Sequence, residues 1–260
     1  MHSLALALLV AAAPAPAAPF EEPIEVPINV PSPIPVGFLV AWKPMILSLN
    51  ISSGTASTFG SEKFQPFRFL GRYTSTWFSE KLLLRGEIEG GQFQSDTQNT
   101  SLGSNGYDVT VRLLGGTATK ISPGFIITAS AGLLSRYQRG RAVGGAPSIG
   151  LLGVTSNVEF EYRFAPLITF SLFFEGGLTP IPYAAESRLG LLSDASELRG
   201  RLQFSLDVSP KAAIDIGYDF TRWHLSFSES NALAPAGSAD KALLIEAREQ
   251  ALTFGVRWKP

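Results

Sequence analysis

The chain contains no cysteine and only two histidines, and this scarcity removes several kinds of site at once. Without thiols there are no disulfides, no thiolate nucleophile and no Cys-based zinc or iron–sulfur site. His2 lies in an N-terminal leader, so His224 is the histidine that a mature protein would keep, and a multi-histidine metal site is excluded. We therefore expect no metal and no cofactor.

A basic surplus and a long apolar run are also missing. The formal net charge is -1, so a nucleic-acid partner, which needs a basic surface to neutralise phosphates, is not expected. No stretch after residue 20 approaches the roughly 20 apolar residues of a transmembrane helix. Yet 45% of the 260 residues are hydrophobic, so the apolar residues must follow another pattern.

The N-terminal segment is typical of an exported protein. Residues 1–18 predict a secretory signal peptide, because a short apolar run precedes the small-residue motif Ala15-Pro16-Ala17. Residues 19–44 are rich in proline, which favours extended chain and opposes sheet pairing. We interpret them as a periplasmic tether and expect the folded domain at residues 45–260.

Beyond residue 45, apolar and polar residues alternate over long segments, as in β-strands with one apolar face. Val158, Phe160 and Tyr162, for example, share one face opposite Glu159 and Glu161. Such alternation accounts for a high hydrophobic content without any apolar run.

Short turns recur about every 44 residues, and the links between them are longer and rich in Gly, Ser, Asn and Asp. This asymmetry indicates an up-and-down meander. Two long strands per repeat fit a spanning hairpin better than propeller blades or a soluble sandwich. We predict about ten strands, with eight or twelve as alternatives. Their expected ranges are 45–58, 65–78, 82–94, 106–119, 125–138, 149–164, 168–179, 195–208, 212–226 and 243–258. Residues 36–42 are an alternative that would add a strand or replace the first one.

The two faces of these strands predict contact with lipid. The apolar faces lack charge over about the 9–11 residues that a tilted spanning strand requires. Aromatic residues near strand ends, such as Tyr162 and Trp258 beside the short turns and Trp223 towards the loops, are typical of interfacial girdles. The sequence therefore predicts an all-β fold, an antiparallel up-and-down transmembrane β-barrel, because closure leaves no unpaired edge in lipid.

The chain resembles Gram-negative outer-membrane β-barrel proteins, of the porin-like and small-barrel kind, over residues 45–258. The resemblance rests on the leader, the absence of cysteine, the short turns and long loops, and a last strand whose Phe254, Val256 and Trp258 are similar to a C-terminal insertion signal. It implies an outer-membrane location. The implied partners are membrane lipid or lipopolysaccharide, the barrel insertion machinery, and small ions or solutes.

The strand positions that are expected to point into the barrel contain equal numbers of basic and acidic residues. Barrels of about eight strands are filled by side chains, whereas an aqueous channel needs roughly sixteen. We therefore expect a mostly plugged, ion-paired lumen, with a narrow pore for small solutes as the alternative. The predicted network comprises Arg68, Arg72, Arg85, Glu87, Glu89, Asp108, Arg112, Arg136, Glu159, Glu161, Arg163, Glu175, Arg199, Arg201, Asp207, Asp215, Asp219 and Arg257.

One group of residues offers a catalytic alternative. Near the loops the apolar set of the last two strands changes phase, which predicts a β-bulge in each. If their hairpin is centred near residue 235, His224 lies opposite Glu246 and shares a face with Ser226, a set with the logic of acyl transfer. The segment 224–226 is also similar to the His-x-Ser motif of outer-membrane lipid A deacylases. That resemblance implies a lipid-modifying acyl hydrolase.

Another enzyme class, the ten-stranded omptin-like proteases, needs paired aspartates and an Asp-x-His motif. Arg222 stands two residues before His224, so the motif does not match. We predict a structural or adhesive barrel, or a narrow pore, rather than an enzyme. Loops 95–105, 180–195 and 228–242 are the expected ligand-contacting surface.

Overall fold

A computed structural model describes residues 36–53, 56–65, 67–77, 82–95, 104–139, 148–185, 190–228 and 242–259. No helix in these ranges could cross a membrane. The strands are β1 (Gly37–Trp42), β2 (Met45–Ser53), β3 (Ala56–Gln65), β4 (Arg68–Trp77), β5 (Leu82–Ser95), β6 (Ser104–Ser122), β7 (Phe125–Arg139), β8 (Ile149–Ala165), β9 (Ile168–Ala185), β10 (Leu191–Ser209), β11 (Ala212–Ser228) and β12 (Leu243–Trp258).

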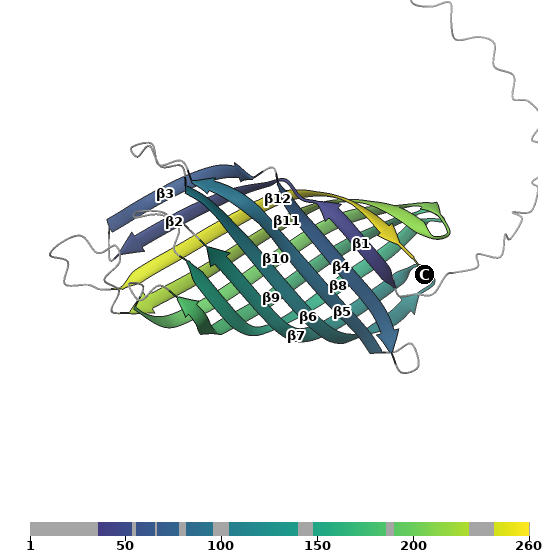
Figure 1. The fold of residues 1–260 in the computed structure, drawn as a ribbon. Coiled ribbons are helices and arrows are strands. Elements are labelled where there is room, and N and C mark those ends of the chain that lie inside the picture. Colours follow the sequence, from purple (N-terminus) through teal and green to yellow (C-terminus); the bar gives the residue numbers. More distant parts are fainter. Residues whose placement is uncertain are drawn as a thin grey trace, which may run out of the picture. The chain divides into compact units, whose positions relative to one another are not determined.

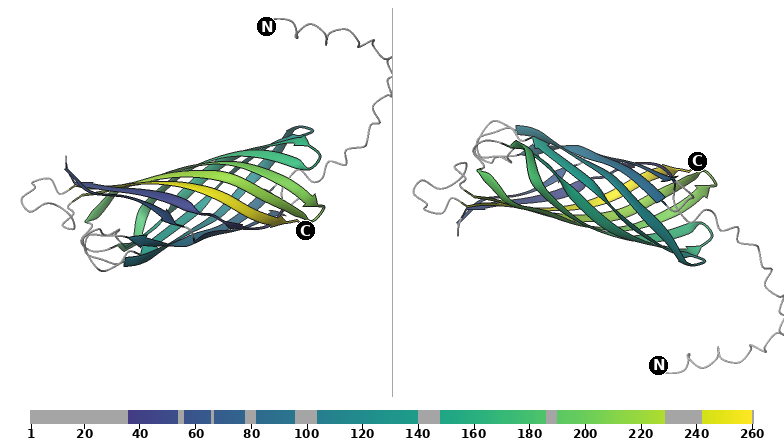
Figure 2. Two further views of the ribbon diagram at one scale, coloured as in Figure 1. Left: turned by 90° about the horizontal axis from the view of Figure 1, so that it is seen from above. Right: turned by 90° about the horizontal axis from the view of Figure 1, so that it is seen from below.

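These segments form one antiparallel sheet that closes through the pairing of β1 with β12 (Figures 1 and 2). β1 and β2 pair with β12 in a single register, since Phe38 lies opposite Trp258 and Met45 opposite Ala251. Pro44 has no backbone N–H and interrupts the ladder between them. β3 and β4 likewise lie end to end along β2 and β1, but with a one-residue shift in register between them, since Met45 lies opposite Gln65 and Trp42 opposite Phe69. The twelve segments therefore make the predicted ten strands of a closed barrel.

The first strands differ from their predicted ranges. β1 lies inside residues 19–44, the segment interpreted as a tether, so the barrel begins at Gly37. The predicted strand 45–58 contains β2 and the beginning of β3. Residues 36–42, the alternative first strand, form β1, which lies in line with β2 along β12 and replaces neither β2 nor the count of ten. Residues 1–35, including the predicted signal peptide, lie outside the described residues.

Exposure along the strands is the reverse of that in a soluble protein. Phe174, Ile216 and Leu252 are about half exposed on the outer face, at 50%, 51% and 50%, whereas Arg199 and Asp215 inside are 1% and 0% exposed. An apolar outside and a charged inside suit a barrel whose outer wall contacts lipid. The predicted fold class is confirmed.

We call the two ends of the barrel the turn end and the loop end. The turn end carries the tight turns at residues 123–124, 166–167 and 210–211, and there β1 begins and β12 ends. Outward aromatic pairs cover the closing seam at this end: Phe38 stacks on Trp258, and Trp42 stacks on Phe254, with ring centroids 6.3 Å and 5.8 Å apart. These pairs stabilise the contact that closes the barrel.

Candidate functional site

The structure places the predicted network of charges on the inner face of the barrel. Most of these side chains are buried, and Arg163, Asp207 and Arg257 near the turn end are partly exposed. The inward position follows from strand alternation, since successive side chains point to opposite faces of the sheet.

Arg199 on β10 is the centre of this network. Its Nη1 donates to Glu87 Oε1 on β5 at 2.5 Å, and its Nη2 donates to Glu89 Oε2 at 3.3 Å. Asp219 and Glu175 lie 3.4 Å and 3.7 Å from the same guanidinium. Because β5 and β10 are not neighbours in the sheet, these bonds cross the lumen.

Arg112 on β6 makes a second set of crossings. It donates to Glu175 Oε1 on β9 at 2.8 Å and to Glu197 Oε1 on β10 at 2.7 Å. Its Nη1 also donates to Glu87 at 3.2 Å, so Arg112 and Arg199 share that carboxylate. The interior is thus cross-linked by guanidinium groups that each bridge several carboxylates.

Three buried members of the network were absent from the prediction. Lys43 donates to Glu89 at 2.6 Å and is 2% exposed, but it stands in the segment interpreted as a tether. Glu197 pairs with Arg112, and Glu249 accepts from Arg136 at 3.0 Å. Glu197 could have been predicted, because it stands two residues before Arg199 on the same strand and its side chain therefore points to the same face.

Near the turn end the packing is looser. Arg85 donates to Glu159 at 2.7 Å, and Arg257 donates to Asp215 at 2.6 Å. A cavity of about 20 Å³ lies among Arg85, Glu159, Glu161 and Arg257, which is room for about one water molecule. This cavity is far too small to be a solute passage.

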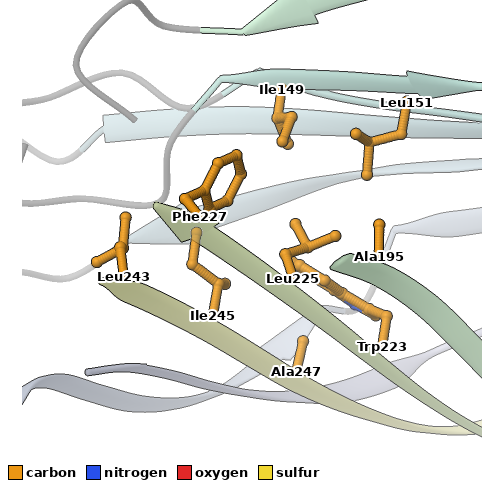
Figure 3. Packing of buried hydrophobic residues seen from close by; sticks show 9 residues of the cluster. All are labelled: Ile149, Leu151, Ala195, Trp223, Leu225, Phe227, Leu243, Ile245 and Ala247. Carbon is orange, nitrogen blue, oxygen red and sulfur yellow. The ribbon is translucent and has the colours of Figure 1, made fainter. Parts of the chain in front are cut away.

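At the loop end the interior becomes apolar. Nine buried residues, each at most 4% exposed, point towards one another from β8, β10, β11 and β12 (Figure 3). We call this set the apolar plug. Trp223 joins it to the charged network, since its Nε1 donates to Glu249 at 3.1 Å and the Arg136 guanidinium lies 5.3 Å from its ring centroid. The plug comprises Ile149, Leu151, Ala195, Trp223, Leu225, Phe227, Leu243, Ile245 and Ala247.

The plug corrects two predictions. β11 and β12 pair without a register shift from Phe227 opposite Leu243 to Ala212 opposite Trp258, so the predicted bulges are wrong. Trp223 faces the interior and belongs to no outer girdle. The change of phase has another cause: on β11 the outward apolar run ends at Phe220, and beyond it the outer wall is polar, as in a soluble protein. We infer that this part of the wall rises above the lipid.

The candidate catalytic residues lie on that polar outer wall. His224 Nδ1 is 3.7 Å from Glu246 Oε1, and His224 Nε2 is 3.9 Å from Asp194 Oδ2. Arg222 donates to Glu246 at 2.9 Å and thereby lowers the pKa of that carboxyl. Ser226 Oγ lies 3.1 Å from the Ser193 hydroxyl that donates to it. The structure therefore brings His224 between two carboxylates, while Ser226 pairs with a second serine.

This wall does not form a metal site. Within the described ranges no group of three or more His, Asp and Glu side chains could hold a metal ion. The arrangement can orient an imidazole on the same strand face as the Ser226 hydroxyl, and these are two of the groups that acyl transfer uses.

Comparison with known proteins concerns the fold. The chain is similar to the outer membrane protease OmpT from Escherichia coli, with 12% identity, a TM-score of 0.47, and coverage of 86% of this chain and 97% of that one. It is also similar to the translocator domain of the autotransporter NalP from Neisseria meningitidis, with 11% identity, a TM-score of 0.44, and coverage of 86% of this chain and 89% of that one. A third similar structure is the outer membrane protein OprG from Pseudomonas aeruginosa, with 8% identity, a TM-score of 0.36, and coverage of 86% of this chain and 97% of that one. No protein-family model matches the chain, and no curated protein does. The strand pairing and the exposure pattern establish by themselves a closed antiparallel barrel with an apolar outer face and a charged interior, the form of a transmembrane β-barrel.

Proposed function

We propose that this protein is a non-conducting outer-membrane barrel, a rigid membrane scaffold that acts through its outer surfaces rather than through its lumen. The observation that carries the proposal is the filled interior: guanidinium groups bridge opposite walls, and the apolar plug occupies the loop end. A structural or adhesive role fits such a barrel. The alternative of a narrow solute pore needs a passage that these side chains occupy.

The partners of this scaffold remain part of the proposal. Lipid contacts the outer belt, and Phe254, Val256 and Trp258 stand on the last strand, where the insertion machinery would read them. All three are exposed on the lipid face, at 40%, 40% and 50%. An adhesive partner would meet the long loops at the loop end. The predicted loops 95–105 and 228–242 lie largely outside the described residues, whereas most of the predicted loop 180–195 belongs to β9 and β10, so that prediction is wrong.

Conductance distinguishes a scaffold from a pore. We expect the purified, folded protein to give no discrete current steps in planar lipid bilayers, because guanidinium–carboxylate bonds cross the lumen of this ten-stranded barrel. Heat-dependent migration on gels confirms that the sample is a folded barrel. Reproducible single-channel steps that scale with protein concentration would overturn the proposal in favour of a pore.

A second candidate function is acyl hydrolysis at the outer wall. The observation that favours it is His224 held between Glu246 and Asp194, just beyond the lipid-facing belt, where an ester of a membrane lipid would lie. The Ser226 oxygen would bond to the ester carbonyl carbon and give its proton through His224 to the departing alcohol. Water would then release the fatty acid.

Fatty-acid release tests this second function. Outer membranes carrying the protein should deacylate lipid A, and His224→Ala or Ser226→Ala should lower the rate by roughly 10²-fold or more. Ser228→Ala, two residues further along the same face, is the matched control and should keep full activity. The hydrolase is rejected if membranes with the unaltered protein release no more fatty acid than membranes without it.

A further inference from the structure

The lipid-facing belt contains a groove over β6–β10, five strands that lie side by side (Figure 1). Its volume is about 540 Å³. The outward residues along its floor are small, whereas Val158, Phe174 and Leu198 stand as its apolar rim. The outward floor residues are Gly115, Thr117, Ala129, Ala131, Ser156 and Gly176.

Gly176 and Gly115 leave room for a side chain on the outer face. A Cβ placed on Gly176 would meet no heavy atom within 4 Å, and one on Gly115 would meet only Leu84 Cδ2 at 3.9 Å. Inward glycines behave differently, since a Cβ on Gly132 would lie 1.9 Å from the Leu113 carbonyl oxygen. Backbone crowding therefore explains Gly132, but it does not explain Gly176 or Gly115.

We propose that this groove is a binding site for one acyl chain of a membrane lipid. The groove is continuous with the outer belt, so the apolar material that reaches it is the hydrocarbon of the bilayer. A flexible chain that lies in the groove would contact the small residues of its floor and the larger side chains of Val158, Phe174 and Leu198 beside them. Such contact exceeds what the flat remainder of the belt offers, because dispersion energy grows with the number of neighbouring atoms.

A second copy of the protein is the competing occupant. In a two-fold dimer the patch contacts its own copy, so the rim side chains of one copy would have to fit the floor of the other. A flexible acyl chain needs no such match. The proposal depends on the lipid-facing belt and is independent of whether the lumen conducts.

Filling the groove tests the proposal. The protein is reconstituted in dioleoylphosphatidylcholine vesicles and extracted into mild detergent, and the phospholipid that stays bound is measured by native mass spectrometry. We expect a single retained phospholipid on the unaltered protein. Gly176→Leu should lower its occupancy roughly tenfold, because the leucine side chain replaces about two methylene contacts.

The matched control is Gly86→Leu, an outward glycine on β5 that does not line the groove and whose Cβ would meet only Leu113 Cδ2 at 3.9 Å. This variant should retain the lipid. Ala131→Leu provides a second groove-filling variant if Gly176→Leu does not fold, as judged by gel migration. Equal lipid retention by groove and control variants, no retained lipid on any of them, or a dimer that the groove variants abolish would each overturn the proposal.

Discussion

Replacing Arg199 by methionine is expected to lower the free energy of unfolding by about 3–5 kcal/mol, the usual effect of breaking a buried ion pair. The side chain is 1% exposed and lies within 4 Å of Glu87, Glu89, Glu175 and Asp219. Methionine preserves much of the volume, so the expected loss comes from carboxylates left in the interior without their cation. Urea unfolding of the folded barrel in lipid vesicles, followed by gel migration, measures the change.

Arg163→Met is the matched control for this prediction. The Arg163 side chain is 27% exposed and donates to Asp207, which also accepts from Lys259 at 2.5 Å. Loss of this solvated pair should cost less than about 1 kcal/mol. Adding Glu87→Gln to Arg199→Met should recover part of the lost stability, since it removes one uncompensated charge. Equal unfolding midpoints for the Arg199 and Arg163 variants would contradict the central role of Arg199.

The fold was accessible from the sequence because alternation is a local property. From β5 to β12 each strand has its own apolar face, and turns such as Pro123-Gly124 separate neighbouring strands. β1 was predicted only as an alternative first strand, because it is short and follows a proline-dense segment. Its membership of the barrel depends on pairing with β12, more than two hundred residues away in the chain (Phe38 with Trp258).

Partners within the lumen could be predicted only as a set. Alternation assigns Arg112 and Glu175 to the inside, but which carboxylate meets which guanidinium depends on the closed barrel bringing β6 next to β9 and β10 across the interior. The facing of His224 and Glu246 was accessible, because hairpin partners follow from the centre of the loop that joins them. The contact of His224 with Asp194 joins β11 to β10 and had no such local signal.

The apolar plug explains why the change of phase was misread as two bulges. A bulge adds one residue to a strand, so apolar residues whose positions shift by one would still point outward. This interpretation assumes that lipid surrounds the whole length of the strand. In the structure the register of β11 and β12 is unbroken, and near the loop end the apolar residues point into the barrel. Trp223 and Phe227 point inward, and Arg222 and His224 point outward, because the wall near the loop end no longer faces hydrocarbon.

Trp223→Ala tests whether the plug stabilises the barrel and closes it independently of the ion pairs. We expect a loss of about 3–5 kcal/mol, because a large buried side chain is removed and Glu249 loses the indole donor 3.1 Å away. Tyr218→Ala on the lipid face of the same strand, where Tyr218 is 43% exposed, should cost much less. Conductance should stay absent in the Trp223 variant, since Arg112 and Arg199 still bridge the lumen below the plug. Current steps in the Trp223 variant alone would show that the plug, and not the ion pairs, closes the lumen. A loss of stability no larger than that of the Tyr218 variant would show that the plug does not stabilise the barrel.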